Sequence, residues 1–167
     1  MRTRIAVVLL LLLGGFGCDE ARSDPVSTAE KSQRVTMQLL GVRAPGHVLI
    51  QVASLEVTAD GRPVSVALEP GQVDLGTADH AWPIATFSVP TAAQQVALTL
   101  GFLPDGSLER SGISEPLDLR GAPISWESNA TWLLERKRVV LEVDVERSLE
   151  ARDGQPATFL PEFLVRY

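Results

Sequence analysis

Alternation of apolar and polar residues is the strongest pattern in the chain. From Gln95 to Phe102 every second residue is a large apolar one, and from Leu141 to Glu146 aliphatic residues alternate with acidic ones. Successive side chains of a β-strand point to opposite faces, so this pattern predicts strands with one apolar face. Helical periodicity is almost absent, and any helix is expected to be short.

Segments of strand composition fill most of the remaining chain after about residue 35, and Pro, Gly and Asp-Gly turn signals separate them. They are Val35–Val42, His47–Val57, Pro63–Leu68, Gln72–Leu75, Ile84–Val89 and Thr158–Tyr167, with the weaker candidates Leu117–Leu119 and Ile124–Trp126. Short strands with frequent turns predict an all-β fold, an antiparallel sandwich or barrel. We expect a β-sandwich domain over residues 35–167.

The last two apolar-faced segments are predicted to pair, and their register depends on the turn between them. A two-residue Asp153-Gly154 turn would set Val145 opposite Glu162 and mix apolar with charged side chains on one face. A three-residue loop, 153–155, instead sets Val145 opposite Phe163 and keeps the apolar side chains together. We therefore expect the second register. It also pairs Val143 with Val165, Leu141 with Tyr167, and Glu142 with Arg166.

The N-terminal segment has a different pattern. Arg2 and Arg4 precede an uninterrupted apolar run from Ile5 to Leu13, and small residues follow up to Cys18. A basic start, a short apolar run and small residues before a cleavage site are typical of a secretory signal. A membrane-spanning helix needs about 20 apolar residues, roughly twice this run. We therefore expect residues 1–17 to be a signal peptide.

Two cleavage reactions fit this segment. Gly15-Phe16-Gly17 satisfies the small-x-small pattern of ordinary signal peptidase, which would leave Cys18 as a free N-terminal cysteine. The same residues with Cys18 resemble the lipobox of bacterial lipoproteins, where the chain is cut before a diacylglyceryl-modified cysteine; that family prefers Leu at the position of Gly15. Cys18 is the only cysteine, and unmodified it would be a reactive thiol in an oxidising compartment. We therefore expect an acyl-modified Cys18 that anchors the protein to a membrane of the bacterial cell envelope, on the periplasmic side or at the cell surface.

Composition and charge narrow the possible partners. Residues 18–34 lack apolar bulk and periodicity, so we expect a flexible tether that spans on the order of 20 Å. Without residues 1–17 the chain keeps 13 basic and 21 acidic side chains, a formal charge of −8. This charge argues against nucleic acid as a partner, because phosphate backbones are bound mainly through Lys and Arg.

The order of motifs in the domain adds a family resemblance. Ala44-Pro45-Gly46 precedes the strand His47–Val57, Asp60-Gly61 and Val73-Asp74-Leu75 follow, and Val89-Pro90 precedes Gln95–Leu100. This order, with the two C-terminal strands, resembles an uncharacterised family of bacterial lipoprotein domains that open with a Thr-Asp-Ala-Pro segment. The resemblance implies an immunoglobulin- or transthyretin-like sandwich with no established activity, and it carries no catalytic residue across.

Two sets of residues are candidates for ligand binding or catalysis. Trp82, Trp126 and Trp132 would form a carbohydrate-stacking platform if they were exposed and coplanar, although core packing is the usual role of tryptophan. His80 follows Asp79 in a predicted loop and is the candidate general base of a hydrolase, but no G-x-S-x-G or other nucleophile motif accompanies it.

A third set concerns ions. Glu142, Asp144 and Glu146 would line one strand face and could collect a hard cation, although a solvated outer face is the commoner arrangement. The two histidines lack metal-site spacing, and we expect no metal or other cofactor beyond the acyl group. The basic cluster Arg136-Lys137-Arg138 is expected to flank a strand.

These observations predict an exported, lipid-anchored protein that is not an enzyme and whose β-sandwich has a binding or structural role in the envelope. A carbohydrate-binding module and a hydrolase are the alternatives. Sandwich loops or an exposed edge strand are the expected contact surface, with an envelope protein or a glycan as the partner.

Overall fold

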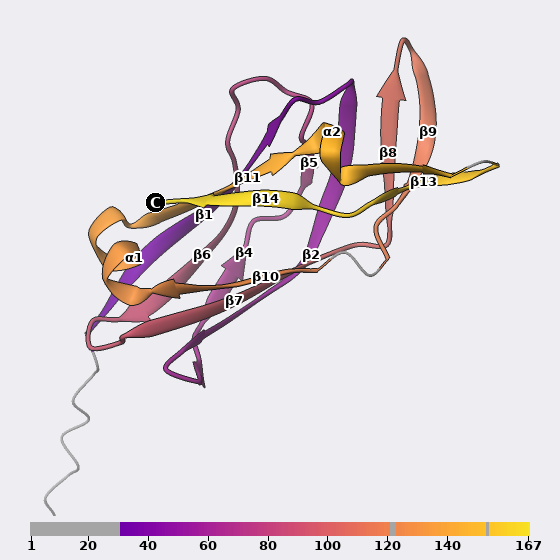
Figure 1. Cartoon of the computed structure of the whole chain (residues 1–167). Coiled ribbons are helices and arrows are strands. Elements are labelled where there is room, and N and C mark those ends of the chain that lie inside the picture. Colours follow the sequence, from indigo (N-terminus) through magenta and orange to yellow (C-terminus); the bar gives the residue numbers. More distant parts are fainter. Residues whose placement is uncertain (1–30, 121–122, 153) are drawn as a thin grey trace, which may run out of the picture.

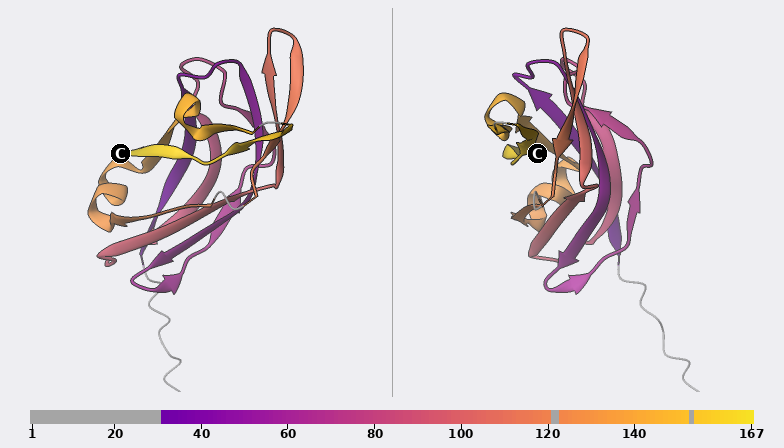
Figure 2. Two further views of the ribbon diagram at one scale, coloured as in Figure 1. Left: turned by 45° about the vertical axis from the view of Figure 1, so that its right-hand side comes forward. Right: turned by 90° about the vertical axis from the view of Figure 1, so that its right-hand side faces the viewer.

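The computed structural model describes residues 31–120, 123–152 and 154–167. These residues form two β-sheets that pack face to face (Figure 1). Strands predominate, and two short helices lie beside them. The views in Figure 2 show the sheets curving around a shared interior. The prediction of an all-β sandwich is therefore confirmed.

The first sheet has the strand order β14-β11-β1-β6-β4. Its strands are β1 (Ser32–Val42), β4 (Val66–Leu68), β6 (Trp82–Pro90), β11 (Arg138–Asp144) and β14 (Glu162–Arg166). β1 runs parallel to β11, and the other neighbours are antiparallel. β1 begins three residues before Val35, where we expected the domain to start.

The second sheet has the order β10-β7-β2-β8-β9-β13-β12, and β3 and β5 each pair with β2. Its strands are β2 (His47–Ala59), β3 (Arg62–Pro63), β5 (Gln72–Asp74), β7 (Gln95–Phe102), β8 (Asp105–Arg110), β9 (Ile113–Asp118), β10 (Ile124–Asn129), β12 (Leu149–Arg152) and β13 (Gln155–Phe159). β9 and β13 are parallel. Both sheets are thus mixed, with antiparallel pairing predominant.

Two short helices connect strands at the side of the sandwich. Helix α1 (Ala130–Arg136) begins where the Asn129 side chain accepts a hydrogen bond from the Thr131 N–H, and it ends at Lys137 in the left-handed conformation. Helix α2 (Val145–Ser148) begins at Asp144, whose side chain accepts from the Arg147 N–H. Both helices connect to β11, one before it and one after it.

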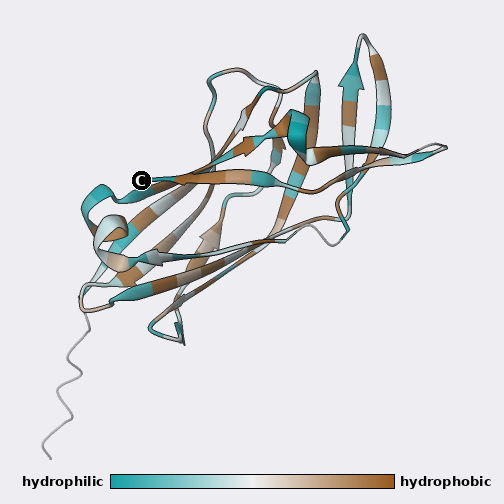
Figure 3. Cartoon of the chain, viewed as in Figure 1, coloured by the Kyte–Doolittle hydropathy of each residue, from teal (hydrophilic) through white to brown (hydrophobic). Residues whose placement is uncertain are grey.

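The core follows the alternation seen in the sequence. Along β7, Val96, Leu98 and Leu100 are buried while the residues between them are exposed or half-buried. Figure 3 shows the same alternation as bands of apolar and polar residues along the strands. Phe87 and Phe159 are the largest fully buried side chains among the described residues, one from each sheet. The sandwich therefore depends on apolar side chains contributed by both sheets.

Two predicted strands are divided in the structure. The segment predicted as Pro63–Leu68 separates into β3, which pairs with β2, and β4, which joins the other sheet. The segment predicted as Thr158–Tyr167 separates into β13 and β14, with Pro161 between them. Proline cannot donate a ladder hydrogen bond, which accounts for the break at Pro161. The strand β8 was not predicted.

The predicted register of the C-terminal strands is wrong by two residues. In the structure Val143 lies opposite Phe163 and Leu141 opposite Val165. The shift arises from α2. This helix adds four residues, Val145–Ser148, between β11 and β12, whereas the connection between β13 and β14 on the other side of the hairpin has only two residues, 160–161. A slip of two residues leaves the same side chains on the same face, so Phe163 still packs against the core.

Gly41, near the end of β1, lies in close contact with the backbone that follows β5. A Cβ atom at this position would overlap the carbonyl oxygen of Leu75, which follows β5 directly. Because the overlapped atom belongs to the backbone, the structure could relieve the overlap only by moving one sheet away from the other. The absence of a side chain at residue 41 therefore sets the spacing at this end of the sandwich.

We expect Gly41→Ala to destabilise the domain by about 1–3 kcal/mol, the usual cost of overpacking a well-packed interior. Urea denaturation followed by circular dichroism measures this free energy of unfolding. Gln38→Ala on the outward face of the same strand is the matched control and should change stability much less. Equal stability of Gly41→Ala and the unaltered protein would contradict the close approach.

Asp74 connects the loop after β5 to the start of β2. Its carboxylate accepts hydrogen bonds from His47 Nδ1 at 2.7 Å and the Thr77 hydroxyl at 3.0 Å, and from the backbone N–H groups of Gly76 at 2.8 Å and Val48 at 3.1 Å. Burial alone would raise the pKa of Asp74, but these hydrogen bonds outweigh burial and lower that pKa below its ordinary value. The hydrogen bond to Asp74 raises the pKa of His47.

This pair makes stability depend on pH. The raised pKa of His47 means that its contribution is complete below the ordinary value of 6.5 and is lost as the pH rises through the raised value. The lowered pKa of Asp74 means that its contribution is lost only as the pH falls below 3.8 through the lowered value. We expect the free energy of unfolding, measured by urea denaturation across a pH series, to fall above pH 6.5. His47→Gln should remove this fall, and His80→Gln should keep it; a fall that survives in His47→Gln would contradict the assignment.

Candidate functional site

A groove of about 380 Å³ lies on the solvent side of the first sheet, where β1 and β11 end and β14 begins. Helix α2 and the connection before β14 form its walls. Its lining residues are Val42, Arg43, Glu142, Asp144, Arg147, Pro161, Glu162, Phe163 and Leu164. The parallel pairing of β1 with β11 sets Val42 directly beside Asp144, so it brings two distant parts of the sequence into one surface.

Asp144 is the centre of the hydrogen bonds and ion pairs in the groove. It is only 8% exposed, and its Oδ2 forms ion pairs with Arg43 and, at 3.4 Å, with Arg147 Nε. The Asp144 carbonyl accepts a hydrogen bond of 2.6 Å from the Ser148 hydroxyl, whose oxygen accepts one of 2.9 Å from the Glu162 N–H. These contacts fix α2 against β11 and β14, and with it the wall of the groove.

Glu142 and Arg166 form a second ion pair beside the groove. The Arg166 guanidinium donates two hydrogen bonds to the Glu142 carboxylate, one of them 2.9 Å long from its NH2 group. This hydrogen bonding lowers the pKa of Glu142 and raises that of Arg166. The predicted pairing of Glu142 with Arg166 in the ladder is wrong, because Glu142 lies opposite Leu164. The two side chains meet diagonally instead, since Arg166 is two residues farther along the same strand face.

Two arginines and three carboxylates line the groove. The side chains of Arg43 and Arg147 are 56% and 66% exposed, so part of each guanidinium faces solvent. Asp144 pairs with both arginines, and Glu162 lies 3.9 Å from Arg147 as a second partner. Val42, Pro161 and Leu164 add apolar surface, and Leu164 is 60% exposed. The groove therefore offers both apolar surface and charged hydrogen-bond donors to solvent. The nine described residues that line it include no histidine, cysteine or hydroxyl group.

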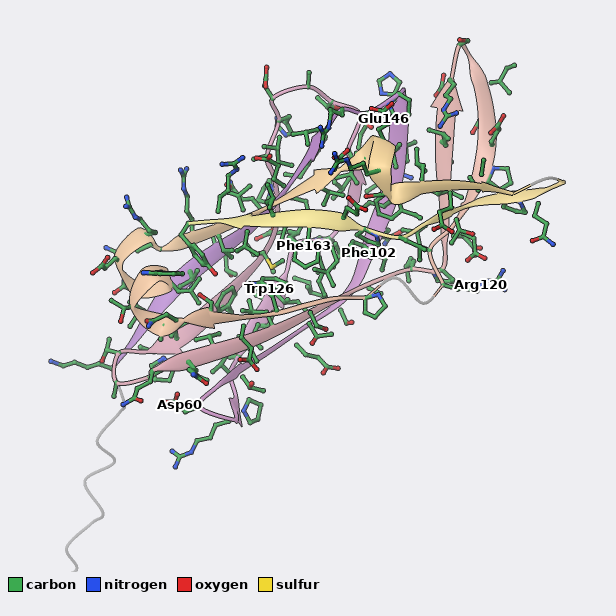
Figure 4. All side chains as sticks on the ribbon, viewed as in Figure 1. Asp60, Phe102, Arg120, Trp126, Glu146 and Phe163 are labelled. Carbon is green, nitrogen blue, oxygen red and sulfur yellow. The ribbon has the colours of Figure 1, made fainter. Side chains whose placement is uncertain are left out.

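The predicted acidic row does not form a cation site. Glu142 and Asp144 lie on β11, as expected, but arginines already occupy both carboxylates. Glu146 lies on α2 and not on the strand, which ends at Asp144 (Figure 4). Among the residues that the structure describes, no group of three His, Cys, Asp or Glu side chains is placed to hold a metal ion.

The three tryptophans lie in three different surroundings. Trp82 lies at the start of β6, where its Nε1 donates a hydrogen bond of 2.9 Å to the Asp74 carbonyl and its ring meets His80 edge-on at 4.3 Å. The His80 side chain is exposed and therefore lacks the buried setting that a hydrolase base would require. With Glu69 and Gln72, among others, these two rings line a second groove of about 320 Å³.

The other two tryptophans have separate partners. Trp126 on β10 packs edge-on against Phe163 of β14, with ring centres 6.3 Å apart, and fills the space between these two edge strands (Figure 4). Trp132 on α1 is 54% exposed and lies against Tyr167, with ring centres 5.4 Å apart. No ring contact among the described residues joins two tryptophans. The structure therefore does not bring Trp82, Trp126 and Trp132 together into the carbohydrate-stacking platform that the sequence suggested.

The groove residues Arg43 and Arg147 were not predicted from the sequence, and no local signal marks them. Each acquires its role only through the pairing that brings Asp144 beside the end of β1. Arg43 follows β1 in the left-handed backbone conformation, with φ of 54°. The anchor candidate Cys18, in contrast, lies outside the residues that the structure describes, as does the expected signal peptide.

Comparison with known proteins adds no relative. No protein-family model matches the chain, and no curated protein or solved structure is significantly similar to it. Within the described residues, no helix is long and apolar enough to cross a membrane. The resemblance to the lipoprotein family with a Thr-Asp-Ala-Pro opening stays a prediction.

Proposed function

We propose that this chain is an exported bacterial lipoprotein, anchored through an acyl-modified Cys18, whose β-sandwich binds a partner protein in the cell envelope without catalysing a reaction. The anchor rests on the sequence of residues 1–18: a basic start, a short apolar run and one cysteine after small residues. Several acyl chains on one residue hold a protein at a membrane, since each buried methylene contributes about 0.8 kcal/mol.

The observation that carries the binding role is the groove beside the free edge of β14. β14 is the last strand of its sheet and pairs only with β11 among the described strands. An edge strand presents backbone N–H and C=O groups to solvent, and an extended segment of another protein can add to it as a further strand. The groove lies against the first half of β14, so a segment on this edge would have a site for its side chains.

The chemistry of the groove indicates what such a segment carries. Val42 and Leu164 offer apolar surface to one side chain. The exposed parts of Arg43 and Arg147 offer N–H donors to an acidic side chain or a terminal carboxylate. We therefore propose an extended segment with an apolar and an acidic residue as the ligand.

We expect metabolic labelling with a fatty-acid analogue to modify the unaltered protein and not Cys18→Ala. The physical reason is that the cysteine sulfur is the acceptor of the diacylglyceryl group in lipoproteins of the kind proposed. Labelled protein is detected after electrophoresis, and membrane fractions are probed in parallel. An unlabelled wild-type protein, or a Cys18→Ala variant that is still labelled, would contradict the anchor.

We expect a photo-crosslinking amino acid at position 164 to give a discrete adduct with an envelope protein in living cells. Leu164 is 60% exposed on the groove side of β14, so the probe would face a bound segment without disturbing the core. Ile113 is the matched control, because it is 65% exposed at the turn between β8 and β9. The adduct is identified by mass spectrometry.

The outcome separates a specific site from random contact. Arg43→Gln should weaken the adduct at position 164, since it removes a donor from the groove. No adduct at position 164, or the same adducts at positions 164 and 113, would contradict binding at β14.

A further inference from the structure

Five cations gather around the start of β1 and the end of α1. They are Lys31, Arg34, Arg136, Lys137 and Arg138, here called the basic patch, and all five side chains are exposed. Two of them belong to the N-terminal strand region, and three form the sequence cluster that follows α1. The side chains that project near α1 and β11 in Figure 4 include several with nitrogen tips.

Backbone and side-chain contacts hold the two segments together. The Gln33 side-chain amide donates a hydrogen bond of 2.7 Å to the Leu134 carbonyl, and the Thr36 N–H donates one of 3.0 Å to the Lys137 carbonyl. Thr36 lies beside Arg138 in the parallel ladder. The fold therefore holds the backbone segments that carry the patch side by side.

The five cations form no ion pairs with carboxylates among the described residues. Arg43, Arg120, Arg147 and Arg166, by contrast, each form an ion pair with a carboxylate. The two segments that carry the patch, residues 31–36 and 130–138, contain one acidic residue, the exposed Glu135. The patch thus has a net excess of about four positive charges that face solvent in an acidic protein.

Four acidic side chains lie at the other end of the sandwich, and one of them, Asp118, forms an ion pair with Arg120. Asp105, Glu109, Glu115 and Asp118 lie on the hairpin of β8 and β9. In Figure 1 this hairpin and α1 lie at opposite ends of the molecule. The net positive charge of the basic patch therefore lies where the chain enters from the N-terminal side, away from this acidic hairpin.

We propose that the basic patch binds the anionic phospholipid headgroups of the membrane that carries the anchor. This inference rests on the anchor in the proposed function. Twelve residues separate Cys18 from Lys31, and a coil of that length spans on the order of 20 Å. An anchored domain would thus stay within reach of the headgroups, and each Lys or Arg near an anionic surface contributes substantially to binding.

The position of the patch favours a membrane over a nucleic acid or an acidic protein. Weak contacts become effective when a tether keeps both partners together, because the tether raises their local concentration. Of these three partners, only the membrane would be kept at a high local concentration by the anchor. The segment between Cys18 and Lys31 has four acids and one arginine, so positive charge for a headgroup surface must come from the folded domain.

The test uses residues 18–167 with Cys18→Ala, so that binding through an acyl chain does not contribute. Sedimentation with vesicles rich in phosphatidylglycerol measures the partition coefficient, and vesicles of phosphatidylcholine alone are the reference. We expect binding to the anionic vesicles at low salt and its loss at high salt. Arg138→Gln should lower the partition coefficient about five-fold, and the triple variant Arg34→Gln, Arg136→Gln, Arg138→Gln about 100-fold.

Arg110→Gln is the matched control, because Arg110 is exposed, forms no ion pair with a described carboxylate and lies at the end of β8. It removes the same charge and should leave the partition coefficient unchanged. Equal binding to both vesicle types, an equal loss in Arg110→Gln, or tighter binding to polyglutamate or DNA than to anionic vesicles would overturn the proposal. Fatty-acid labelling of Cys18 tests the anchor separately. A failure of headgroup binding by the basic patch can therefore be distinguished from a failure of the lipid anchor.

Discussion

The parallel pairing of β1 with β11 is the interaction on which the rest of the structure depends. It joins an N-terminal strand to one that begins at Arg138, and it runs from Thr36 beside Arg138 to Val42 beside Asp144. Val35, Met37 and Leu39 on β1 are fully buried, as are Val139 and Leu141 on β11. At its first end this pairing assembles the basic patch, and at its last end it assembles the groove. Both candidate surfaces therefore follow from one long-range contact.

Local pattern predicted the elements well where alternation is strict. β7 was predicted with the bounds that the structure has, because its apolar residues repeat with the period of a strand. The Asp60-Gly61 turn was also predictable, since both residues adopt positive φ, 48° and 76°, in the conformation that short hairpins require. β8 was missed because its six residues include one large apolar side chain, Leu108, which gives no period.

Contacts between distant segments could not be predicted in the same way. The parallel pairing joins β1 to β11 across almost 100 residues, and no feature of either strand specifies its partner. The register error at the C-terminus has a similar origin: Val145 continues the alternation of β11 in sequence, but Asp144 begins α2 and the strand stops. An Asp that accepts from the N–H three residues later competes with strand pairing. The candidate site was out of reach for the same reason, because Arg43 and Asp144 meet only through the fold.

The two ends of β1 give the proposed functions a consistent geometry. β1 has 11 residues, and a rise of roughly 3.3 Å per residue separates its ends by about 30 Å. If the basic patch at the start of β1 lies on the headgroups, the groove at its far end stands about that distance from the membrane. The start of β14, where the groove lies beside Asp144, would then face the space of the envelope and not the lipid. A short tether alone would leave the orientation of the domain random, whereas a positive end beside the tether gives the anchored domain one preferred orientation, with the groove accessible to a protein partner.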